Sequence, residues 1–380
     1  MPRYPFKNPL KRFGAALFDF AGNLLFFIPR RAAVRRFQAQ RNSFQRILVI
    51  RLDHLGDLLM TRPALEALRR RYPQAEIDLL IAAEWAPLFQ GGWTSGEVIL
   101  VKNHWFKRPP EYSKALPEIQ ALLPKLRQKK YDLAVDFRGD LRNIFLMKWA
   151  GIPNRLGFGR TGAGFLLSNE APYREDLHQV HLNLHLLKAL EIDSAPARVP
   201  VEYPESRRYE FMKRYESLLA SAPVPRIIMH PAAGIAAKQW PSSKFMALLE
   251  KISSQNLGHV FIIGTADDKK SFPVETVSPY VHDLRGETSL ADLPVLFDLC
   301  DLFVGNDSGP GHLAAAQGLE CVIIFSGTNR PEIWRPWTEK LYVLDPGAGN
   351  ADAISSDQVL EVIKKSLAKA GRSSKMEKLQ

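Results

Sequence analysis

Two carboxylates and an imidazole follow a short apolar run near the start of the chain. The segment ILVIRLDHLGD places Asp53, His54, Gly56 and Asp57 directly after apolar residues 47–50. A carboxylate at the point where a buried strand turns into a helix can take a proton from a substrate hydroxyl. Asp57 could equally be a helix N-cap, with Gly56 allowing a tight turn, so this segment alone leaves catalysis and capping open.

A lysine lies in a loop of small residues in the second half of the chain. The segment HPAAGIAAKQWPSSKF, residues 230–245, follows a strand candidate and contains Lys238 just before Gln-Trp-Pro. The small side chains leave room for a bulky ligand beside the backbone, and the ammonium group of Lys238 could then reach a phosphate. The alternative is an exposed loop lysine beside a structural Trp-Pro pair.

A third segment, VGNDSGPGHLAAAQG at residues 304–318, combines polar side chains with the start of a helix. The backbone N–H groups of a helix N-terminus form an anion site. Ser308 and His312 could add hydrogen-bond donors, and Asp307 could bind ribose hydroxyls or order the loop. The alternative is a capped helix with a buried, satisfied histidine, and the density of Gly, Pro, Asp, Ser and His in one turn argues against it.

Common catalytic and metal-binding patterns are absent from the chain. It has no Asp-x-Asp triplet, no G-x-x-x-x-G-K-[ST] and no G-x-S-x-G segment. His178, His181 and His185 have helical spacing, but no acidic or cysteine pattern completes a zinc site. Cys300 and Cys321 form neither a disulfide framework nor a metal set. We therefore expect no metal and no cofactor.

The three segments must be positioned by regular elements of secondary structure. Along the chain, short apolar runs alternate with amphipathic stretches of helical length. Such a rhythm is typical of βα repeats in a mostly parallel sheet. A helix is expected at about 57–71, and Pro63 would kink it or restart it. The strand candidates are 47–51, 77–82, 98–101, 133–137, 155–158, 226–229, 260–263, 281–284, 302–304 and 321–325.

Prolines interrupt this rhythm over residues 192–225, which we interpret as a linker with one short helix. We therefore expect an α/β fold with two doubly wound Rossmann-like domains, at residues 46–191 and 226–371, and a polar tail at 372–380. Two such domains would place a ligand cleft between them, at the carboxyl ends of their strands.

Residues 1–45 form a basic, amphipathic extension. Residues 1–46 hold ten basic residues and one acidic residue, Asp19, and so carry +9 of the chain's net charge of +11. At about 100° per residue, an apolar face formed by Phe13, Leu17, Phe20, Leu24 and Phe27 lies opposite Arg12, Asp19, Asn23 and Arg30.

The extension has two possible partners. Its apolar run is shorter than the ~20 residues that a spanning helix needs, and no signal-peptide cleavage site follows it. It could lie in the plane of an anionic membrane surface, or it could pack on the protein itself or on a partner protein. No nucleic-acid role is expected, because the basic residues are interleaved with a Phe/Leu face.

The three segments together resemble glycosyltransferase family 9, the lipopolysaccharide heptosyltransferase family. The resemblance extends from residue 46 to about residue 345 and rests on ILVIRLDHLGDLLMTRPALEALRRRYP, KQWP, LRGETSLADLPVLFDLCDLFVGNDSGPGHLAAAQG and IFSGTNRPEIWRPW. It implies a GT-B fold, in which the N-terminal domain binds the acceptor and the C-terminal domain binds a nucleotide-activated sugar, usually ADP-heptose.

The resemblance also assigns roles to individual residues. It implies Asp57 as the catalytic base and Lys238 as the contact to the donor diphosphate. The expected donor-binding residues are Gly264, Thr265, Glu287, Thr288, Asp307, Ser308, Gly309 and His312, and those expected on the acceptor side are Arg51, Asp53, His54 and Gly56. Family members often have small hydroxyl residues where this chain has Asp53-His54, so the base stays open between Asp57 and Asp53.

The function expected from this resemblance is an inverting, metal-independent transfer of heptose from ADP-heptose to the lipopolysaccharide core. The enzyme would be cytoplasmic and peripheral, on the inner face of the bacterial inner membrane. Its partners would be the nucleotide sugar, a lipid-linked oligosaccharide acceptor and, through residues 1–45, an anionic membrane. The alternatives are another nucleotide sugar or glycan acceptor, or a non-catalytic nucleotide-binding scaffold at the membrane.

Overall fold

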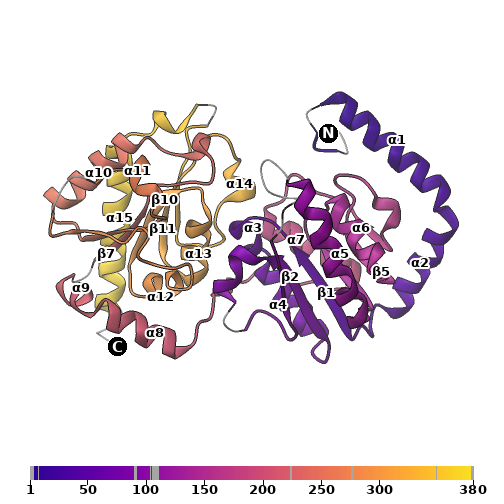
Figure 1. Cartoon of the computed structure of the whole chain (residues 1–380). Coiled ribbons are helices and arrows are strands. Elements are labelled where there is room, and N and C mark those ends of the chain that lie inside the picture. The colour runs from indigo at the N-terminus through magenta and orange to yellow at the C-terminus, as the bar shows by residue number, and fades with distance from the viewer. Residues whose placement is uncertain are drawn as a thin grey trace. The chain divides into compact units, whose positions relative to one another are not determined.

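The computed structural model describes residues 4–6, 8–89, 92–102, 104, 111–222, 225–274, 278–347 and 349–377, with only the backbone for Tyr112 and for 370–377. The chain divides into two compact units, Met1–Ala197 and Arg198–Gln380. This division falls inside the linker predicted at 192–225. Figure 1 shows in each unit a sheet flanked by helices, as expected for an α/β protein.

The first unit is built on a six-stranded parallel sheet with the order β3-β2-β1-β4-β5-β6. Its helices are α1 to α7, and α1 and α2 come from the N-terminal extension. The strands are β1 (Arg46–Arg51), β2 (Glu76–Ala82), β3 (Val98–Val101), β4 (Leu133–Asp136), β5 (Asn154–Phe158) and β6 (Asn169–Ala171). The helices are α1 (Pro9–Leu25), α2 (Phe27–Gln40), α3 (Leu55–Leu59), α4 (Arg62–Arg71), α5 (Tyr112–Lys129), α6 (Leu141–Trp149) and α7 (Gln179–Leu187), with 3-10 turns η1 (Ala83–Leu88), η2 (Gly164–Leu166) and η3 (Lys188–Leu190).

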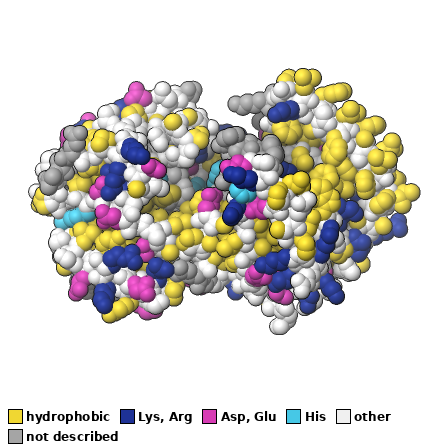
Figure 2. Space-filling view, in the orientation of Figure 1, with side chains coloured by type: hydrophobic (Ala, Val, Ile, Leu, Met, Phe, Trp, Pro, Cys, Tyr) yellow, Lys and Arg dark blue, Asp and Glu magenta, His cyan; other side chains and the backbone are white. Residues whose placement is uncertain are grey.

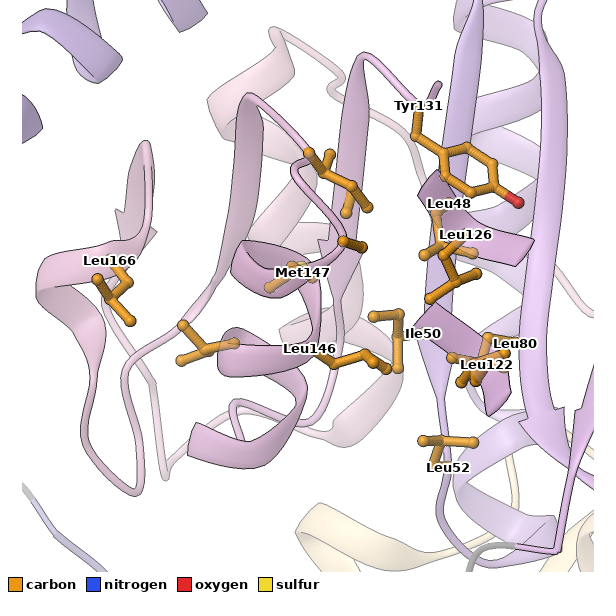
Figure 3. Close-up of a cluster of buried hydrophobic side chains, with 14 of the residues drawn as sticks. Leu48, Ile50, Leu52, Leu80, Leu122, Leu126, Tyr131, Leu146, Met147 and Leu166 are labelled. Atoms are coloured by element: carbon orange, nitrogen blue, oxygen red, sulfur yellow. The ribbon is translucent and has the colours of Figure 1, made fainter. Parts of the chain in front are cut away.

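The core of the first unit explains why the sequences of its strands are continuous apolar runs. Parallel strands between two layers of helices are buried on both faces, and Ile47 to Ile50 are fully buried. On one face, Leu48 and Ile50 belong to a cluster with Leu126 of α5 and Met147 of α6 (Figure 3). This packing fixes β1, and therefore the loop that follows it.

The second unit repeats the same topology with the strand order β12-β11-β10-β7-β8-β9, again parallel throughout. The strands are β7 (Arg226–His230), β8 (His259–Ile262), β9 (Val281–Asp283), β10 (Leu302–Asn306), β11 (Glu320–Ile324) and β12 (Leu341–Leu344). The helices are α8 (Glu205–Arg214), α9 (Glu216–Ser221), α10 (Ser242–Ser254), α11 (Asp268–Ser271), α12 (Leu293–Asp298), α13 (Gly309–Gln317), α14 (Pro331–Trp334) and α15 (Ser356–Glu377), with 3-10 turns η4 (Ala236–Lys238) and η5 (Ala351–Ala353). Thus α15 runs into the predicted polar tail, and 378–380 lie outside the described residues.

In both units the chain reverses its winding direction at the middle of the sheet. In the first unit this switch lies between β1 and β4, and in the second it lies between β7 and β10. Loops that leave two such neighbouring strands in opposite directions open a crevice at the carboxyl edge of the sheet, where doubly wound proteins bind ligands. Each unit therefore has one topologically favoured position for a site.

Candidate active site

The first polar cluster lies where β1 ends and α3 begins. Arg51, the last residue of β1, is 2% exposed, and its Nη1 donates a hydrogen bond of 2.7 Å to the carbonyl of Phe137 after β4. Its Nη2 lies 3.2 Å from Oδ1 of Asp57, which is in the first turn of α3. One buried guanidinium group therefore joins the two loops on either side of the β1/β4 switch.

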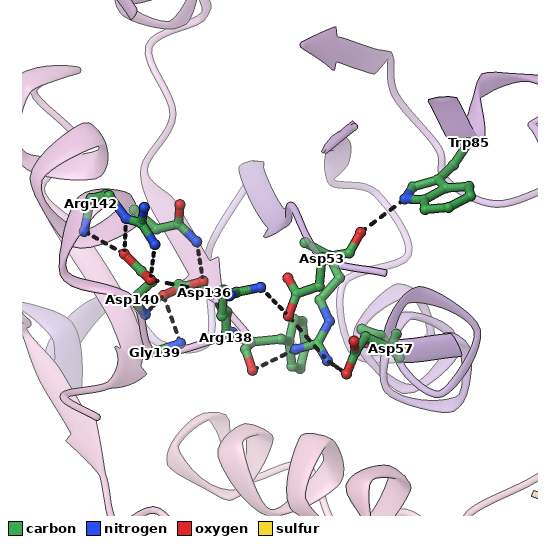
Figure 4. Close-up of polar contacts among 12 residues, drawn as sticks. Asp53, Asp57, Trp85, Asp136, Arg138, Gly139, Asp140 and Arg142 are labelled. Carbon is green, nitrogen blue, oxygen red and sulfur yellow. Dashed lines mark hydrogen bonds and ion pairs between the residues drawn. The ribbon is translucent and has the colours of Figure 1, made fainter. Parts of the chain in front are cut away.

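Asp53 also lies at the β1/β4 switch, where it contacts the loop after β4. Its Oδ2 lies 3.0 Å from Nη1 of Arg138, in the loop after β4, and 3.8 Å from Nη2 of Arg51. Its backbone carbonyl accepts a hydrogen bond of 2.9 Å from Nε1 of Trp85 (Figure 4). Its Oδ1 is buried without a hydrogen-bond partner in the part of the chain that the structure describes.

The environment of Asp57 favours its protonated form more than water does. Burial raises the pKa of Asp57, and the nearby carboxylate of Asp53 raises it further, while Arg51, His54 and Arg138 act in the opposite direction. A carboxylate with a raised pKa is a stronger base than an ordinary aspartate, which suits proton removal from a hydroxyl. Of the other predicted acceptor-side residues, His54 is exposed and Gly56 is buried in the first turn of α3.

The loop that carries Arg138 is shaped by a buried aspartate at the end of β4. Asp136 accepts hydrogen bonds from the backbone N–H groups of Arg138 (3.1 Å), Gly139 (2.9 Å) and Asp140 (3.2 Å), and from Nδ2 of Asn143 (2.9 Å). Burial raises the pKa of Asp136 to about 7. Gly139 has a φ of +75°, and an added Cβ would lie 2.7 Å from the Phe158 carbonyl.

Sequence reasoning did not single out Arg138 or Asp136. The available signal was the charged run DFRGD directly after a buried strand, at the same edge of the sheet as Asp53. Its importance depends on β4 lying next to β1, which no local pattern reveals.

The second polar cluster lies at the β7/β10 switch of the second unit. Oδ2 of Asp307, which follows β10, lies 2.6 Å from Nζ of Lys238 and 2.7 Å from Nδ2 of Asn329, and its Oδ1 lies 3.8 Å from Nε2 of His312 in α13. Burial alone would raise the pKa of Asp307, but His312 and Lys238 hold it down at about 2. The structure thus joins three of the predicted residues and adds Asn329, which sequence reasoning did not assign.

A buried amide fixes the loop that carries Lys238. Asn306, at the end of β10, accepts a hydrogen bond of 2.9 Å from the backbone N–H of Trp240 and donates one of 2.7 Å to the carbonyl of Pro231. The indole Nε1 of Trp240 donates to the carbonyl of Ile354 (3.0 Å), and its ring packs edge-on against Phe245 at 4.7 Å. The Lys238 loop is therefore tied to both β10 and the core, so that its position does not depend on a ligand.

Two histidines flank the start of α13. Nδ1 of His230, the last residue of β7, lies 3.1 Å from Oγ of Ser308, and burial lowers the pKa of His230 to about 4. Nδ1 of His312 is buried with no hydrogen-bond partner within the described part of the chain. The positive end of the α13 dipole, at Gly309, lies at the same edge, although Pro310 has no N–H and the N–H groups of Gly311 and His312 already donate to the Ser308 carbonyl (3.1 and 3.4 Å).

The remaining predicted donor residues lie at the ends of the next strands, β8 and β9. Gly264 has a φ of +155°, and the following Thr265 donates from both its backbone N–H and its Oγ1 to Oδ2 of Asp268 (2.6 and 2.8 Å). Glu287 is exposed, and Oγ1 of Thr288 donates to the carbonyl of Leu284 at 3.4 Å. They share the carboxyl edge of the sheet with Lys238 and Asp307, on the β8–β9 side.

The two clusters offer different chemistry. The first presents carboxylates, one with a raised pKa, beside two guanidinium groups. The second presents an ammonium group, an amide, an imidazole and a helix N-terminus, which together fit a phosphate-bearing ligand. Among the described residues, no three His, Cys, Asp or Glu side chains are arranged to hold a metal ion.

A sequence model of glycosyltransferase family 9 (heptosyltransferase) matches residues 119–360, which is more than half of the chain. The match includes the loops after β4, β7, β10 and β11, and so Arg138, Lys238, Asp307 and Asn329.

Individual relatives agree with this match. Lipopolysaccharide heptosyltransferase 3 of Escherichia coli is 25% identical over 301 residues, covering 75% of this chain and 84% of that protein. Lipopolysaccharide heptosyltransferase 2 of Escherichia coli (strain K12) is 26% identical over 325 residues, covering 79% and 87%. The solved structure of E. coli ADP-heptose lps heptosyltransferase II has a TM-score of 0.72 at 24% identity and covers 86% of this chain and all of that one. This likeness confirms the expected GT-B fold class.

Proposed function

The chain belongs to glycosyltransferase family 9 and is a glycosyltransferase, and from this premise we propose that it transfers heptose from ADP-heptose to the core oligosaccharide of lipopolysaccharide. The sugar and the acceptor of this proposal are those of the similar lipopolysaccharide heptosyltransferases. The observation that carries the proposal is the position of Lys238 and the N-terminus of α13, at the crevice of the second unit. A nucleoside diphosphate is an anion that such a cluster would bind.

In the proposed reaction, the oxygen of an acceptor hydroxyl forms a bond to C1 of the heptose while the bond from C1 to the diphosphate breaks. Attack from the opposite face inverts the configuration at C1. Asp57 takes the hydroxyl proton, and burial supports this role because it raises the pKa of Asp57. ADP leaves with the bonding electron pair.

The leaving diphosphate needs positive charge close to it. Lys238 and the positive end of the α13 dipole supply that charge through the protein's own groups, so we propose that the transfer needs no metal ion. Asp307 keeps its negative charge at neutral pH, because its pKa is about 2. It therefore orients Lys238 and His312, and it is also available to the ribose hydroxyls. Gly264, Thr265, Glu287 and Thr288 are proposed to flank the adenosine.

The acceptor is proposed to bind at the first cluster. The carboxylates of Asp53 and Asp57 lie there, and Arg51 and Arg138 supply positive charge. We propose that this acceptor is lipid-linked and that the reaction takes place at the cytoplasmic face of the inner membrane. The reaction requires the acceptor hydroxyl near Asp57 to reach C1 of the donor held by the second unit.

Calorimetric titration with ADP, UDP, GDP and their sugars tests the donor assignment. We expect clear preference for ADP and ADP-heptose, and weaker binding by the Lys238→Ala variant. Preference for UDP or GDP would instead indicate another nucleotide sugar, and no nucleotide binding at all would contradict the proposed function. Analysis of the product by NMR spectroscopy would then show whether the anomeric configuration is inverted.

A further inference from the structure

The two faces of α1 are oriented opposite to those of an ordinary surface helix. Its acidic residue, Asp19, is 2% exposed and accepts hydrogen bonds from Oη of Tyr4 (2.7 Å) and from the backbone N–H of Ala163 (2.7 Å). By contrast, Phe13 is 68% and Leu24 is 73% exposed. Surface helices normally bury their apolar face and expose their polar one. In α1 the polar face docks on the protein and the apolar face points outward.

The docked face is held by specific contacts. Nδ2 of Asn23 donates to the carbonyl of Asp19 (2.7 Å), and Nη1 of Arg30 donates to Oδ1 of Asn23 (2.7 Å). Nη2 of Arg30 also pairs with Glu170 in β6, at 3.0 Å. An added Cβ at Gly22 would lie 2.2 Å from the Phe165 ring, so α1 packs closely here. These contacts therefore fix the orientation of α1 on the first unit.

The outward face forms a continuous apolar surface, here named the α1 face. Figure 2 shows hydrophobic side chains gathered over α1. A patch of this kind on a water-exposed surface marks an interaction site. Its exposed large side chains are those of α1 and of the first residues of α2: Leu10, Phe13, Leu17, Phe18, Phe20, Leu24, Leu25, Phe27 and Ile28.

The charges around the α1 face are all of one sign. Asp19 is the only acidic residue among residues 1–46, and it is buried, so every exposed charge of this segment is positive. Lys11, Arg31 and Arg35 are exposed beside the apolar side chains. An apolar surface bordered by cations complements an anionic lipid bilayer, whose interior is apolar and whose surface is negative.

We propose that the α1 face binds an anionic lipid bilayer with α1 lying in the plane of the membrane. Within the described ranges, no helix is long and apolar enough to cross a bilayer. In-plane insertion uses the exposed apolar side chains without placing the docked polar ones in lipid.

The α1 face is connected to the acceptor-side cluster through one short segment. Ala163, whose backbone N–H donates to Asp19, lies two residues after Thr161. The backbone N–H of Thr161 donates to the Gly139 carbonyl (3.2 Å), and its Oγ1 accepts from the Leu141 N–H (2.8 Å). These residues border the loop of Arg138. Membrane binding would keep the enzyme beside a lipid-linked acceptor in the same membrane, and this benefit rests on the proposed function.

Flotation of the full chain with lipid vesicles tests the proposal. The vesicles are pure phosphatidylcholine or phosphatidylcholine mixed with phosphatidylglycerol, each at low and high salt. The double variant Leu17→Asp/Leu24→Asp changes the α1 face. The matched control is Leu116→Asp on α5 of the same unit, where the native side chain is 59% exposed.

We expect the wild type and the Leu116→Asp variant to float with the anionic vesicles, less so at high salt. The double variant should show about tenfold less bound protein. Absence of wild-type binding, or equal binding by the double variant, would overturn the proposal. A wild-type dimer that the double variant converts to a monomer, without vesicle binding, would instead assign the face to a second copy. ADP binding by the same samples reports on the proposed function separately.

Discussion

Arg51 and Asp57 form an ion pair of 3.2 Å between the end of β1 and the first turn of α3. The same guanidinium group lies 3.8 Å from Asp53, so both candidate bases share one buried cation. Asp53 has a second cationic partner in Arg138, whereas Asp57 is paired only with Arg51 among the described ion pairs. Of the two carboxylates, Asp57 is therefore the less strongly neutralised, which supports its assignment as the base.

Replacing Asp57 by Asn should lower kcat by about 10²–10⁴ while leaving the affinity for ADP unchanged, because the proton acceptor is lost and the donor cluster is intact. Steady-state kinetics and calorimetry measure the two quantities. The matched variant Asp53→Asn should retain more of kcat. If Asp53→Asn abolished turnover and Asp57→Asn did not, the assignment of the base would be reversed.

The acidic limb of the kcat/KM profile should respond to the neighbours of Asp57 in opposite directions. Asp53 raises the pKa of Asp57, so Asp53→Asn should move the limb to lower pH. Arg138 lowers that pKa, so Arg138→Gln should move it to higher pH. Shifts in the same direction for both variants would show that the limb belongs to another group.

Removing the ammonium group of Lys238 should weaken both donor binding and turnover. Lys238→Ala should reduce kcat/KM by about 10²–10³, since charge on the leaving diphosphate is left without its partner. Lys270→Ala is the matched control, because Lys270 is exposed and pairs only with Asp267 among the described ion pairs. Equal effects of the two variants would contradict the role given to Lys238.

Two glycines of α1 offer an internal comparison for the docking of this helix. An added Cβ at Gly14 has no atom within 4 Å, so Gly14→Ala should stabilise the helix by roughly 0.5–1 kcal/mol. At Gly22 the same Cβ would lie 2.2 Å from Phe165, so Gly22→Ala should destabilise the first unit. Chemical denaturation compares the two variants, and limited proteolysis shows whether α1 separates. Similar stability changes would argue against the observed docking.

Stability should depend on the protonation of His230. Its folded-state pKa of about 4 lies below the ordinary value of 6.5, so the unfolded chain binds the proton first as pH falls. The stabilising contribution is present above pH 6.5 and is lost between pH 6.5 and 4, by up to about 3 kcal/mol. Asp136, with a raised pKa of about 7, acts in the opposite direction over the same window.

The contribution of His230 therefore has to be isolated by comparison. Denaturation of the wild type and of His230→Gln at pH 7.5 and pH 5 provides that comparison. The loss of stability on acidification should be smaller in the variant. An unchanged loss would show that His230 is not the responsible group.

The sequence predicted the strands of both sheets well, because strands buried on both faces must be apolar runs. The run at 98–101 coincides with β3, and that at 302–304 extends by two residues into β10. The helix expected at 57–71 is two helices in the structure, α3 and α4. Pro63 lies in the first turn of α4, so the expectation that this proline restarts the helix is confirmed. The edge strands β6 and β12 were not predicted. Asn169–Ala171 is only three residues long and is largely polar, so it carries no strand pattern.

The candidate site could be predicted only in part, because some of its residues depend on which strands are neighbours. Asp57, Lys238 and Asp307 stand out because polar residues follow apolar runs directly. Arg138 and Asn329 act through contacts with residues 85 and 22 positions away, which depend on strand order rather than on local pattern. The residue roles drawn from the family resemblance remain predictions until the variants above are measured.

The hydrogen bond between Asp19 and Ala163 joins residues 144 positions apart. Because synthesis proceeds from the N-terminus, α1 leaves the ribosome long before its docking segment exists. A nascent chain therefore carries the α1 segment without its docking partner throughout the elongation of β1 to β5. The segment can dock only after Ala163 has been synthesised, and a chain that ends before Ala163 cannot form the hydrogen bond from Ala163 to Asp19.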